Sequence, residues 1–359
     1  MSNIRPNKTG VPLYIQLYEH LKKDVVNGIF PYGSRLPSKR TLAAEKRVST
    51  ITVKHAYELL CAEGYLESRQ RSGYYVIFRE EDGFAASAKY VPRPLPHEFV
   101  PSASSFPFSV LTKTMRRVMS DYGEQILERS PNKGCLILRN EIRKYLGRNR
   151  SIYADTEQIV VGSGAEYLYN LIVGLFEKDT VFALEDPSYE KIEKVYRIAG
   201  VCLEMLPLGE NGIESEALSG TAADILHISP YRSFPSGITA SASKKHEYIR
   251  WASKSKRFII EDDYESEFSV SRKAEETMFA LSDHDNVLYM NTFSQTISPS
   301  LRVGYMVLPK RLVEKFDTRL GFYSCTVPTY EQLLIAELLR NGDFERHINR
   351  VRRIKRRKL

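Results

Sequence analysis

Residues 33–76 read GSRLPSKRTLAAEKRVSTITVKHAYELLCAEGYLESRQRSGYYV. Ser38, directly behind a proline, is a residue type that caps the first turn of a helix, so a helix is expected to begin there. Val48 and Ser49 form a turn, and residues 50–64 are a further helical stretch that ends at a glycine. Two helices joined by so short a turn predict a helix-turn-helix.

The flanking residues extend this pattern on both sides. Upstream, residues 11–28 carry leucines and a valine at helical spacing and end at a glycine that suits a helix C-terminus. Downstream, residues 65–77 predict two short strands around a tight Ser72-Gly73 turn. Helices followed by a hairpin in this order predict a winged helix-turn-helix, which we assign to residues 1–79.

The net charge of the chain is concentrated at its two ends. The whole chain carries +8, and residues 1–79 hold 13 Lys and Arg against 6 Asp and Glu, a net of +7. The last ten residues, RVRRIKRRKL, add another +7, which leaves −6 for the residues between them. A basic, compact head is the electrostatic footprint of a module that binds phosphates.

Composition indicates a protein of a reducing compartment. No apolar run approaches the length of a membrane-spanning helix, and the N-terminus lacks the apolar stretch of a signal peptide. The 4 cysteines are scattered, without the spacing of a metal site or the density of a disulfide scaffold. We therefore expect a cytoplasmic protein with reduced thiols, no membrane partner and no bound metal.

A winged helix-turn-helix places its third helix in the major groove of DNA, with the first residues of that helix at the base edges. Hydroxyl groups there can hydrogen-bond bases or phosphates, and basic residues at the start of the second helix can grip the backbone. Basic residues of the wing are placed to touch phosphates or the minor groove. The expected DNA contacts are Lys39, Arg40, Ser49, Thr50, Thr52, Lys54, Arg69, Arg71 and Gly73.

The same residues, 33–76, closely resemble the GntR-type winged helix, whose pattern is LPSxRxLA, VSxxTV, LxxxGY and a glycine in the wing. The match covers the whole head and implies binding of double-stranded DNA. A winged helix used only for protein contacts is the alternative. The basic charge and the hydroxyl-rich start of the third helix argue against that alternative.

The rest of the chain has a different pattern. Residues 80–104 mix small residues, charges and prolines without periodicity and are interpreted as an interdomain linker. In residues 105–359 helical stretches alternate with short β-rich runs such as QIVVG, VFALED, ILHIS and RFIIEDD. This alternation predicts an α/β domain with a largely parallel sheet, helices on both faces and ligands at the carboxyl ends of the strands.

Residues suited to an anion follow two of these runs. Residues 162–165 form a glycine-containing turn between a strand and a helix, where a helix N-terminus can bind an anion. Thr292, Ser294 and Arg302 surround the end of another strand and offer hydroxyl groups and a guanidinium that suit a phosphate.

Acidic residues follow a third run, FII. Asp262 and Tyr264 are expected at the mouth of this buried strand. Asp263, Glu265 and Glu267 are interpreted as solvated charges.

Further stretches over nearly the whole body read FPFSVLTKTMRRVM, SPNKGCLILRNEIRKYL, EDPSY, SPYRSFPSG, EDDYESEF and TFSQTISPSLRVGY. They resemble the fold type I, pyridoxal phosphate-dependent aminotransferases. Head and body together look like the MocR/GabR subgroup of GntR regulators, in which a winged helix is fused to such a domain. The resemblance implies a three-layer α/β/α architecture for residues 105–359.

The resemblance also implies a pyridoxal 5′-phosphate site. Tyr189 of EDPSY would stack on the pyridine ring, Asp262 would pair with the ring nitrogen and Tyr264 would hydrogen-bond the ring oxygen. The resemblance also implies a homodimer, because fold type I sites form between two subunits, and it makes a small amine or amino acid a candidate effector. The phosphate would be held by Gly164, Ala165, Thr292, Ser294 and Arg302.

The sequence departs from the family pattern at Gln295. This residue stands in TFSQTISPSLR where the family carries the lysine that forms the Schiff base with the cofactor. An amide is neither a nucleophile nor a useful base, and no other lysine adjoins the motif. We therefore expect no catalytic residue, with pyridoxal 5′-phosphate bound non-covalently or not at all. The substitution is either natural or engineered.

A second departure concerns the end of the chain. Residues 344–359 correspond to a helix after which the family continues into a C-terminal subdomain that binds the substrate carboxylate. We expect this subdomain to be truncated here. The basic run in these residues is interpreted as a solvated helix face, with a second DNA contact as the alternative.

Three functions are compatible with the sequence. The first is a sequence-specific DNA-binding transcriptional regulator whose aminotransferase-like domain dimerises and senses an effector without transamination. The second is an active pyridoxal phosphate-dependent aminotransferase with a DNA-binding appendage. The third is a truncated, non-functional relic. Gln295 favours the first function over the second.

Overall fold

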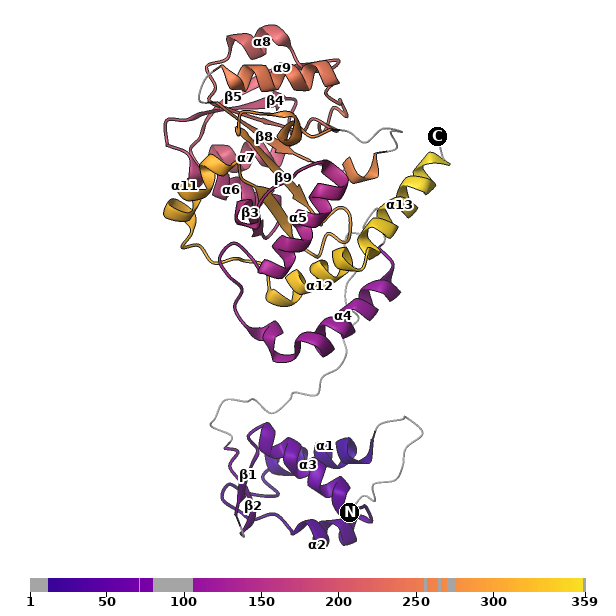
Figure 1. The fold of residues 1–359 in the computed structure, drawn as a ribbon. Helices are drawn as coiled ribbons and strands as arrows, with labels where there is room; N and C mark the ends of the chain where they lie inside the picture. The colour runs from indigo at the N-terminus through magenta and orange to yellow at the C-terminus, as the bar shows by residue number, and fades with distance from the viewer. Residues whose placement is uncertain are drawn as a thin grey trace. The chain divides into compact units, whose positions relative to one another are not determined.

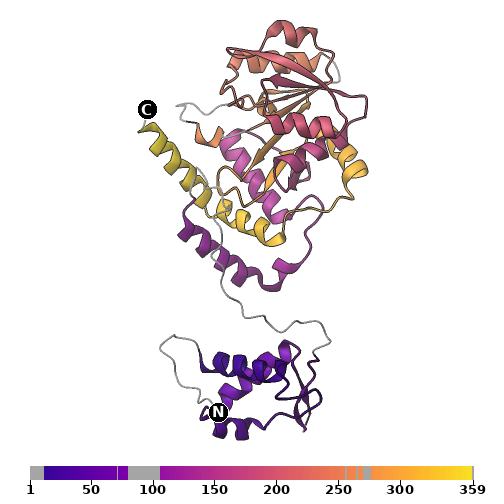
Figure 2. The same cartoon turned by 180° about the vertical axis from the view of Figure 1, so that it is seen from behind.

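Two units, Met1–Phe99 and Val100–Leu359, divide the chain in the computed structural model (Figures 1 and 2). The expected linker, residues 80–104, lies outside the described residues. The structure describes residues 12–70, 72–79, 106–254, 257–263, 266–269 and 276–357.

The first unit is a winged helix-turn-helix, as the sequence predicts (Figure 1). Ser38 Oγ accepts a hydrogen bond of 3.1 Å from the backbone N–H of Thr41, and Ser49 Oγ accepts one of 3.0 Å from that of Thr52. Such caps satisfy N–H groups that the first turn of a helix leaves unpaired. The elements are α1 (Leu13–Val26), α2 (Lys39–Lys46), α3 (Thr50–Ala62), β1 (Leu66–Arg69) and β2 (Gly73–Val76).

The helices and the wing of this unit share one small core. Tyr57 of α3 is fully buried, and its hydroxyl group donates a 2.8 Å hydrogen bond to the carbonyl oxygen of Pro37, which ties α3 to the start of α2. β1 and β2 pair antiparallel, with Arg69 opposite Gly73. Gly73 has a φ of +121°, and a Cβ atom there would lie 3.0 Å from Nε of Arg35. Glycine is therefore required at this point of the wing.

An eight-stranded sheet forms the centre of the second unit, in the order β3-β10-β9-β8-β7-β4-β5-β6. The neighbours β5, β4, β7, β8 and β9 run parallel, whereas β10 runs antiparallel to both β3 and β9. The predicted, largely parallel sheet is confirmed. Its strands are β3 (Ile159–Gly162), β4 (Val181–Asp186), β5 (Cys202–Gly209), β6 (Gly212–Ile213), β7 (Ile225–Ile228), β8 (Phe258–Asp262), β9 (Val287–Thr292) and β10 (Gly304–Val307).

Helices cover both faces of this sheet (Figures 1 and 2). Successive side chains of a strand point to opposite faces, so Val160 and Met290 pack with α6, α7 and α11, whereas Val161 and Tyr289 pack with α5 and α12. The expected three layers are confirmed. The helices are α4 (Phe108–Tyr122), α5 (Leu136–Arg150), α6 (Ala165–Leu175), α7 (Glu190–Ile198), α8 (Ser215–Gly220), α9 (Ala242–Ser253), α10 (Met278–Leu281), α11 (Lys310–Leu320), α12 (Thr329–Arg340) and α13 (Asp343–Arg356), with 3-10 turns η2 (Gly123–Leu127), η3 (Thr156–Gln158) and η4 (Ser266–Phe268).

The strands β3, β4, β7, β8 and β9 all run in the same direction. Their carboxyl ends therefore meet at one edge of the sheet, which is where ligands bind in open α/β sheets. Gly162, Asp186, Asp262 and Thr292 are the last residues of four of them. The strand ends selected from the sequence thus share one edge.

The basic run near the C-terminus lies on α13. Phe344, His347 and Ile348 of this helix are buried, whereas Arg353 and Arg356 are exposed. This amphipathic arrangement agrees with the expected solvated helix face. Within the residues given above, no helix combines the length and the apolar character needed to cross a bilayer.

Candidate ligand site and DNA-binding surface

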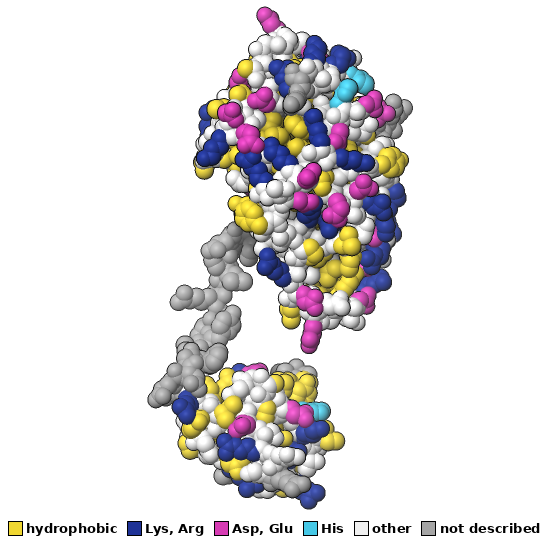
Figure 3. Space-filling model, turned by 60° about the vertical axis from the view of Figure 1, so that its left-hand side comes forward, with side chains coloured by type: hydrophobic (Ala, Val, Ile, Leu, Met, Phe, Trp, Pro, Cys, Tyr) yellow, Lys and Arg dark blue, Asp and Glu magenta, His cyan; other side chains and the backbone are white. Residues whose placement is uncertain are grey.

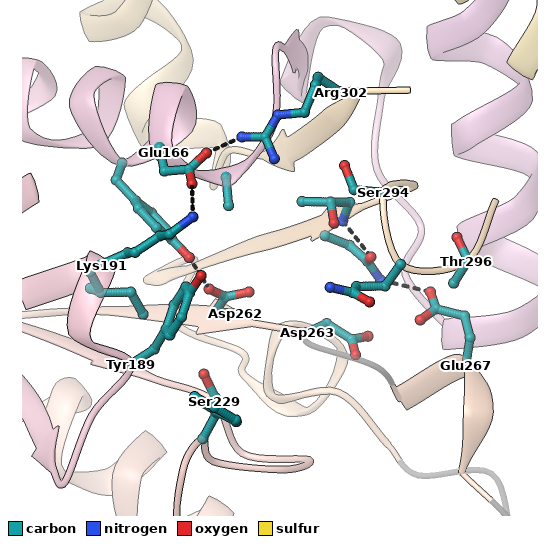
Figure 4. Close-up of a pocket in the computed structure, with 17 residues that line it drawn as sticks. Glu166, Tyr189, Lys191, Ser229, Asp262, Asp263, Glu267, Ser294, Thr296 and Arg302 are labelled. Carbon is teal, nitrogen blue, oxygen red and sulfur yellow. Dashed lines mark hydrogen bonds and ion pairs between the residues drawn. The ribbon is translucent and has the colours of Figure 1, made fainter. Parts of the chain in front are cut away.

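A cavity of about 340 Å³ opens at the carboxyl edge of the sheet (Figure 4). The ends of β8 and β9, the starts of α6 and α7 and the segment after β9 supply its walls. Tyr264, which the sequence also assigned to this site, lies outside the described residues. The residues predicted from the sequence that line the cavity are Ala165, Tyr189, Asp262, Thr292, Ser294, Gln295 and Arg302.

Asp262 contributes a buried carboxylate to the cavity wall. Its Oδ2 accepts a 2.7 Å hydrogen bond from the hydroxyl group of Tyr169, and Nε2 of His227 lies 3.5 Å from the same oxygen. The other ring nitrogen of His227, Nδ1, hydrogen-bonds the hydroxyl group of Tyr196 at 2.7 Å. Burial and the charge of Asp262 raise the pKa of Tyr169, so this phenol remains a donor. The arrangement holds the carboxylate in a position where it can accept a hydrogen bond from a protonated nitrogen of a ligand.

Cationic side chains gather near the start of α6. Lys191 Nζ lies 3.1 Å from Oε1 of Glu166, and the guanidinium of Arg302 pairs with the other oxygen of the same carboxylate (Figure 4). Gly164, just before the helix, has a φ of +89°, and a Cβ atom there would lie 3.1 Å from Nη2 of Arg302. Glycine thus lets the guanidinium approach the backbone at the helix N-terminus. Two cations beside a helix N-terminus are suited to an anion, and here the carboxylate of Glu166 pairs with both cations.

Lys191 and Glu166 were not predicted as site residues. The sequence offers no other lysine adjoining the Gln295 motif, whereas Lys191 reaches the cavity from α7, two residues after Tyr189. The hydrogen bond to Glu166 raises the pKa of Lys191. Partial burial raises the pKa of Glu166, but Lys191 and Arg302 outweigh it and lower the pKa overall. Lys191 is therefore a protonated cation, which makes it a poor nucleophile.

Aromatic rings border the cavity on the side of α7. Tyr189 precedes the first turn of α7, and its ring meets that of Phe234 edge-on, with centroids 5.7 Å apart. The segment that carries Phe234 is anchored by Ser233, whose hydroxyl group donates a 2.8 Å hydrogen bond to Glu185. Burial raises the pKa of Glu185 to about 7. The aromatic pair gives the cavity an apolar wall against which a planar ring can pack.

The expectation that Asp263 and Glu267 are solvated charges is wrong. Their side chains are buried, and Arg150 of α5 lies beside both, with Nε 3.3 Å from Oδ2 of Asp263 and Nη2 3.6 Å from Oε1 of Glu267. The hydroxyl group of Tyr289 donates a 2.6 Å hydrogen bond to Asp263, and Nδ2 of Asn291 donates one of 2.7 Å to Glu267. These partners come from α5 and β9, and no local pattern around the acids indicates them.

The predicted DNA contacts of the first unit are solvent-accessible at the starts of two helices. Lys39 and Arg40 form the first turn of α2 and are exposed, as are Ser49 and Thr50 at the start of α3. The Oγ atom of Ser49 also lies 2.8 Å from Oγ1 of Thr52, so capping already engages both hydroxyl groups. The N-termini of α2 and α3 both favour anions, which suits phosphate groups.

The remaining predicted DNA contacts lie on α3 and the wing. Lys54 is exposed and pairs with Glu58 at 3.6 Å, and Arg69 is exposed at the end of β1. Arg71 lies outside the described residues. Arg35, whose side chain lies beside Gly73, is an exposed cation that the sequence reasoning missed.

Comparison with known proteins assigns both units. Residues 13–76 match the bacterial regulatory proteins of the gntR family, and residues 102–358 match aminotransferase class I and II. The HTH-type transcriptional regulator YdeL of Bacillus subtilis (strain 168) is 32% identical over 365 residues, covering 98% of this chain and 79% of YdeL. The chain belongs to the GntR family of regulators with an aminotransferase class I and II domain.

Two further comparisons describe the relatives of this GntR-family regulator. The pyridoxine biosynthesis transcriptional regulator PdxR of Corynebacterium glutamicum is 27% identical, covering 96% of this chain and 76% of PdxR. Among solved structures, the α-aminoadipate aminotransferase LysN of Thermus thermophilus is 25% identical, with a TM-score of 0.62 over 72% of this chain and 68% of LysN. The LysN structure contains N-(5′-phosphopyridoxyl)-L-leucine.

Glu166→Gln is expected to strengthen binding of pyridoxal 5′-phosphate by about fivefold, roughly 1 kcal/mol, because it removes a negative charge that competes with the phosphate for Arg302 and Lys191. Titration of the absorption or intrinsic fluorescence of the purified protein measures this affinity. Glu190→Gln is the control, since Glu190 pairs with Lys194 and does not line the cavity. Weaker binding to Glu166→Gln than to the unchanged protein would contradict the expectation.

Proposed function

We propose that this chain is a sequence-specific DNA-binding transcriptional regulator whose aminotransferase-like domain binds a phosphopyridoxyl ligand without a covalent bond and without transamination. One observation carries the proposal: the cavity combines the anchors for such a ligand, Asp262 and Arg302, with the amide of Gln295. The similarity to YdeL and PdxR, both transcriptional regulators, supports the regulatory role.

The residues of the cavity fit pyridoxal 5′-phosphate. Asp262 would pair with the ring nitrogen, because its carboxylate is already held by Tyr169 and has a place in the cavity wall. Arg302 and Lys191 would hold the phosphate at the start of α6, and Tyr189 would pack on the ring. When bound, the pyridine ring supplies an electron sink. The chain's own residues position and neutralise the ligand.

The amide of Gln295 argues against transaminase activity. Covalent attachment of the cofactor and proton transfer both require an amine, which Gln295 lacks. Lys191 also lines the cavity, but its ion pair with Glu166 keeps it protonated. The ligand therefore acts on this domain through its binding free energy alone.

We also propose that the second unit forms a homodimer. Large apolar side chains of α4, η2, the start of α5 and the segment after α11 remain exposed, and apolar side chains gather at several places on the face drawn in Figure 3. Exposed apolar surface of this kind is typical of a protein interface. These side chains are Phe108, Met119, Leu127, Leu136, Phe322 and Tyr323.

Replacement of Lys39, Arg40 and Lys54 together by alanine is expected to weaken DNA binding by at least about tenfold at moderate salt, because each lost phosphate contact removes the counterion release that favours binding. The same loss lowers the salt dependence of binding. Fluorescence anisotropy measures the affinity, with a duplex selected by the unchanged protein from a random-sequence library. Lys23→Ala, an exposed lysine near the end of α1, is the control. Full affinity of the triple variant would contradict the proposed DNA surface.

Borohydride treatment is expected to leave no covalent adduct of pyridoxal 5′-phosphate on a residue of the cavity in the unchanged protein, since Gln295 offers no amine and Lys191 is held protonated by Glu166. Gln295→Lys places an amine in the same cavity and is expected to give a visible absorption band before reduction and, after borohydride, a covalent adduct on Lys at position 295 that peptide mapping locates. An adduct on Lys191 of the unchanged protein would contradict non-covalent binding and favour the aminotransferase alternative.

A further inference from the structure

The third helix of the first unit, α3, has one face in the core and the opposite face in solvent. The side chains of the core face are Val53, Ala56, Tyr57 and Leu60, which are all buried. The side chains at the same helical spacing on the other face are exposed, and they are Ile51, Lys54, His55 and Glu58. In a winged helix-turn-helix bound to DNA, the exposed residues at the start of this helix meet the base edges in the major groove.

An apolar side chain stands at the start of this exposed face. Within α3, all of whose residues the structure describes, Ile51 is the one large apolar side chain that is exposed, at 64%. Ile51 also lies outside the hydrophobic core of its unit. A helical side chain covers the turn before its own Cα atom, so Ile51 covers the N-terminal end of α3. A single exposed isoleucine is ordinary elsewhere on a surface, but this one lies where the bases are expected.

The polar side chains nearest to Ile51 already have partners within the chain. Ser49 Oγ accepts a 3.0 Å hydrogen bond from the backbone N–H of Thr52 and lies 2.8 Å from the hydroxyl oxygen of the same residue. One turn further along, Nζ of Lys54 lies 3.6 Å from a carboxylate oxygen of Glu58. A contact between Ile51 and a base would break none of these interactions.

An aliphatic side chain cannot pair with the donors and acceptors of a base edge. Its partner in the major groove is the C5-methyl group, which among the four bases only thymine carries. We propose that Ile51 packs on the C5-methyl group of a thymine, so that this residue specifies a thymine in the DNA sequence that the chain recognises. The proposal rests on the proposed function, because it requires sequence-specific binding of DNA through α3. It adds the base that one residue selects and the chemical group by which it does so.

The test replaces the thymines of the library-selected duplex one at a time by deoxyuridine, which pairs in the same way but lacks the C5-methyl group. Fluorescence anisotropy with the full chain gives the dissociation constant of each duplex. Burial of one methyl group corresponds to about fourfold in affinity, so we expect a loss of about fourfold at one or more thymine positions. The loss at those positions should disappear in Ile51→Ala, as a double-mutant cycle between protein and DNA requires of two groups in contact.

Each protein is compared with itself on duplexes that differ by one methyl group, so a loss of folded protein cancels from the ratio of the two constants. Ile29→Ala is the matched control, because Ile29 is 63% exposed and lies outside α3, and this variant should keep the sensitivity to deoxyuridine. Its loss in Ile29→Ala as well would contradict a specific role of Ile51.

The remaining outcomes separate this inference from the proposed function. Unchanged affinity for every deoxyuridine duplex, or a selected duplex without thymine, would overturn the thymine contact and leave sequence-specific DNA binding intact. A sensitivity to deoxyuridine that persists in Ile51→Ala would overturn the assignment to Ile51. Equal affinity of the unchanged protein for the selected duplex and for a scrambled duplex would overturn the proposed function and this inference with it.

Discussion

The buried ion network around Arg150 joins the elements that form the ligand cavity. Arg150 comes from the last turn of α5, Asp263 follows β8, Glu267 lies in η4, and Tyr289 of β9 and Arg352 of α13 add hydrogen bonds. Removing one partner of a buried charge pair costs about 3–5 kcal/mol, because the other charge is left without compensation. The strand end that positions the neighbouring carboxylate, Asp262, therefore depends on contacts made by helices distant in the sequence.

Local features of the sequence were sufficient to predict the fold of the first unit and the layer architecture of the second. Ser38 and Ser49 cap helices within three residues of themselves, so their role follows from short-range pattern alone. Alternation of strands and helices predicts a parallel sheet, and the common direction of its strands then brings Asp262 and Thr292 to one edge. These are consequences of backbone geometry, which short stretches of sequence encode well.

Side-chain partners across the fold were not predictable in the same way. A run of acids such as EDDYESEF is typical of a solvated loop, and nothing near it indicates that Arg150 buries two of its members. Lys191 is similarly remote from Gln295 in sequence, although both line one cavity. Burial of charge depends on tertiary partners, which one sequence without its fold does not identify. Several residues that line the cavity were therefore predicted, but the charges that surround them were not.

Ligand binding to this domain would exchange charges of the protein for charges of the ligand. A phosphate would replace Glu166 as the partner of Arg302 and Lys191. Such a ligand regulates DNA binding only if it favours one conformation of the chain over another, and the coupling between the sites is then reciprocal.

The most direct test of the central claim is the equilibrium affinity of the purified chain for a library-selected duplex and for a scrambled duplex of equal length. Both are measured at physiological salt, with and without saturating pyridoxal 5′-phosphate. A ligand-sensing, sequence-specific regulator should bind the selected duplex at least about a thousandfold more tightly, and the ligand should shift that affinity by about fivefold or more. Equal affinity for the two duplexes, unchanged by the ligand, would contradict it.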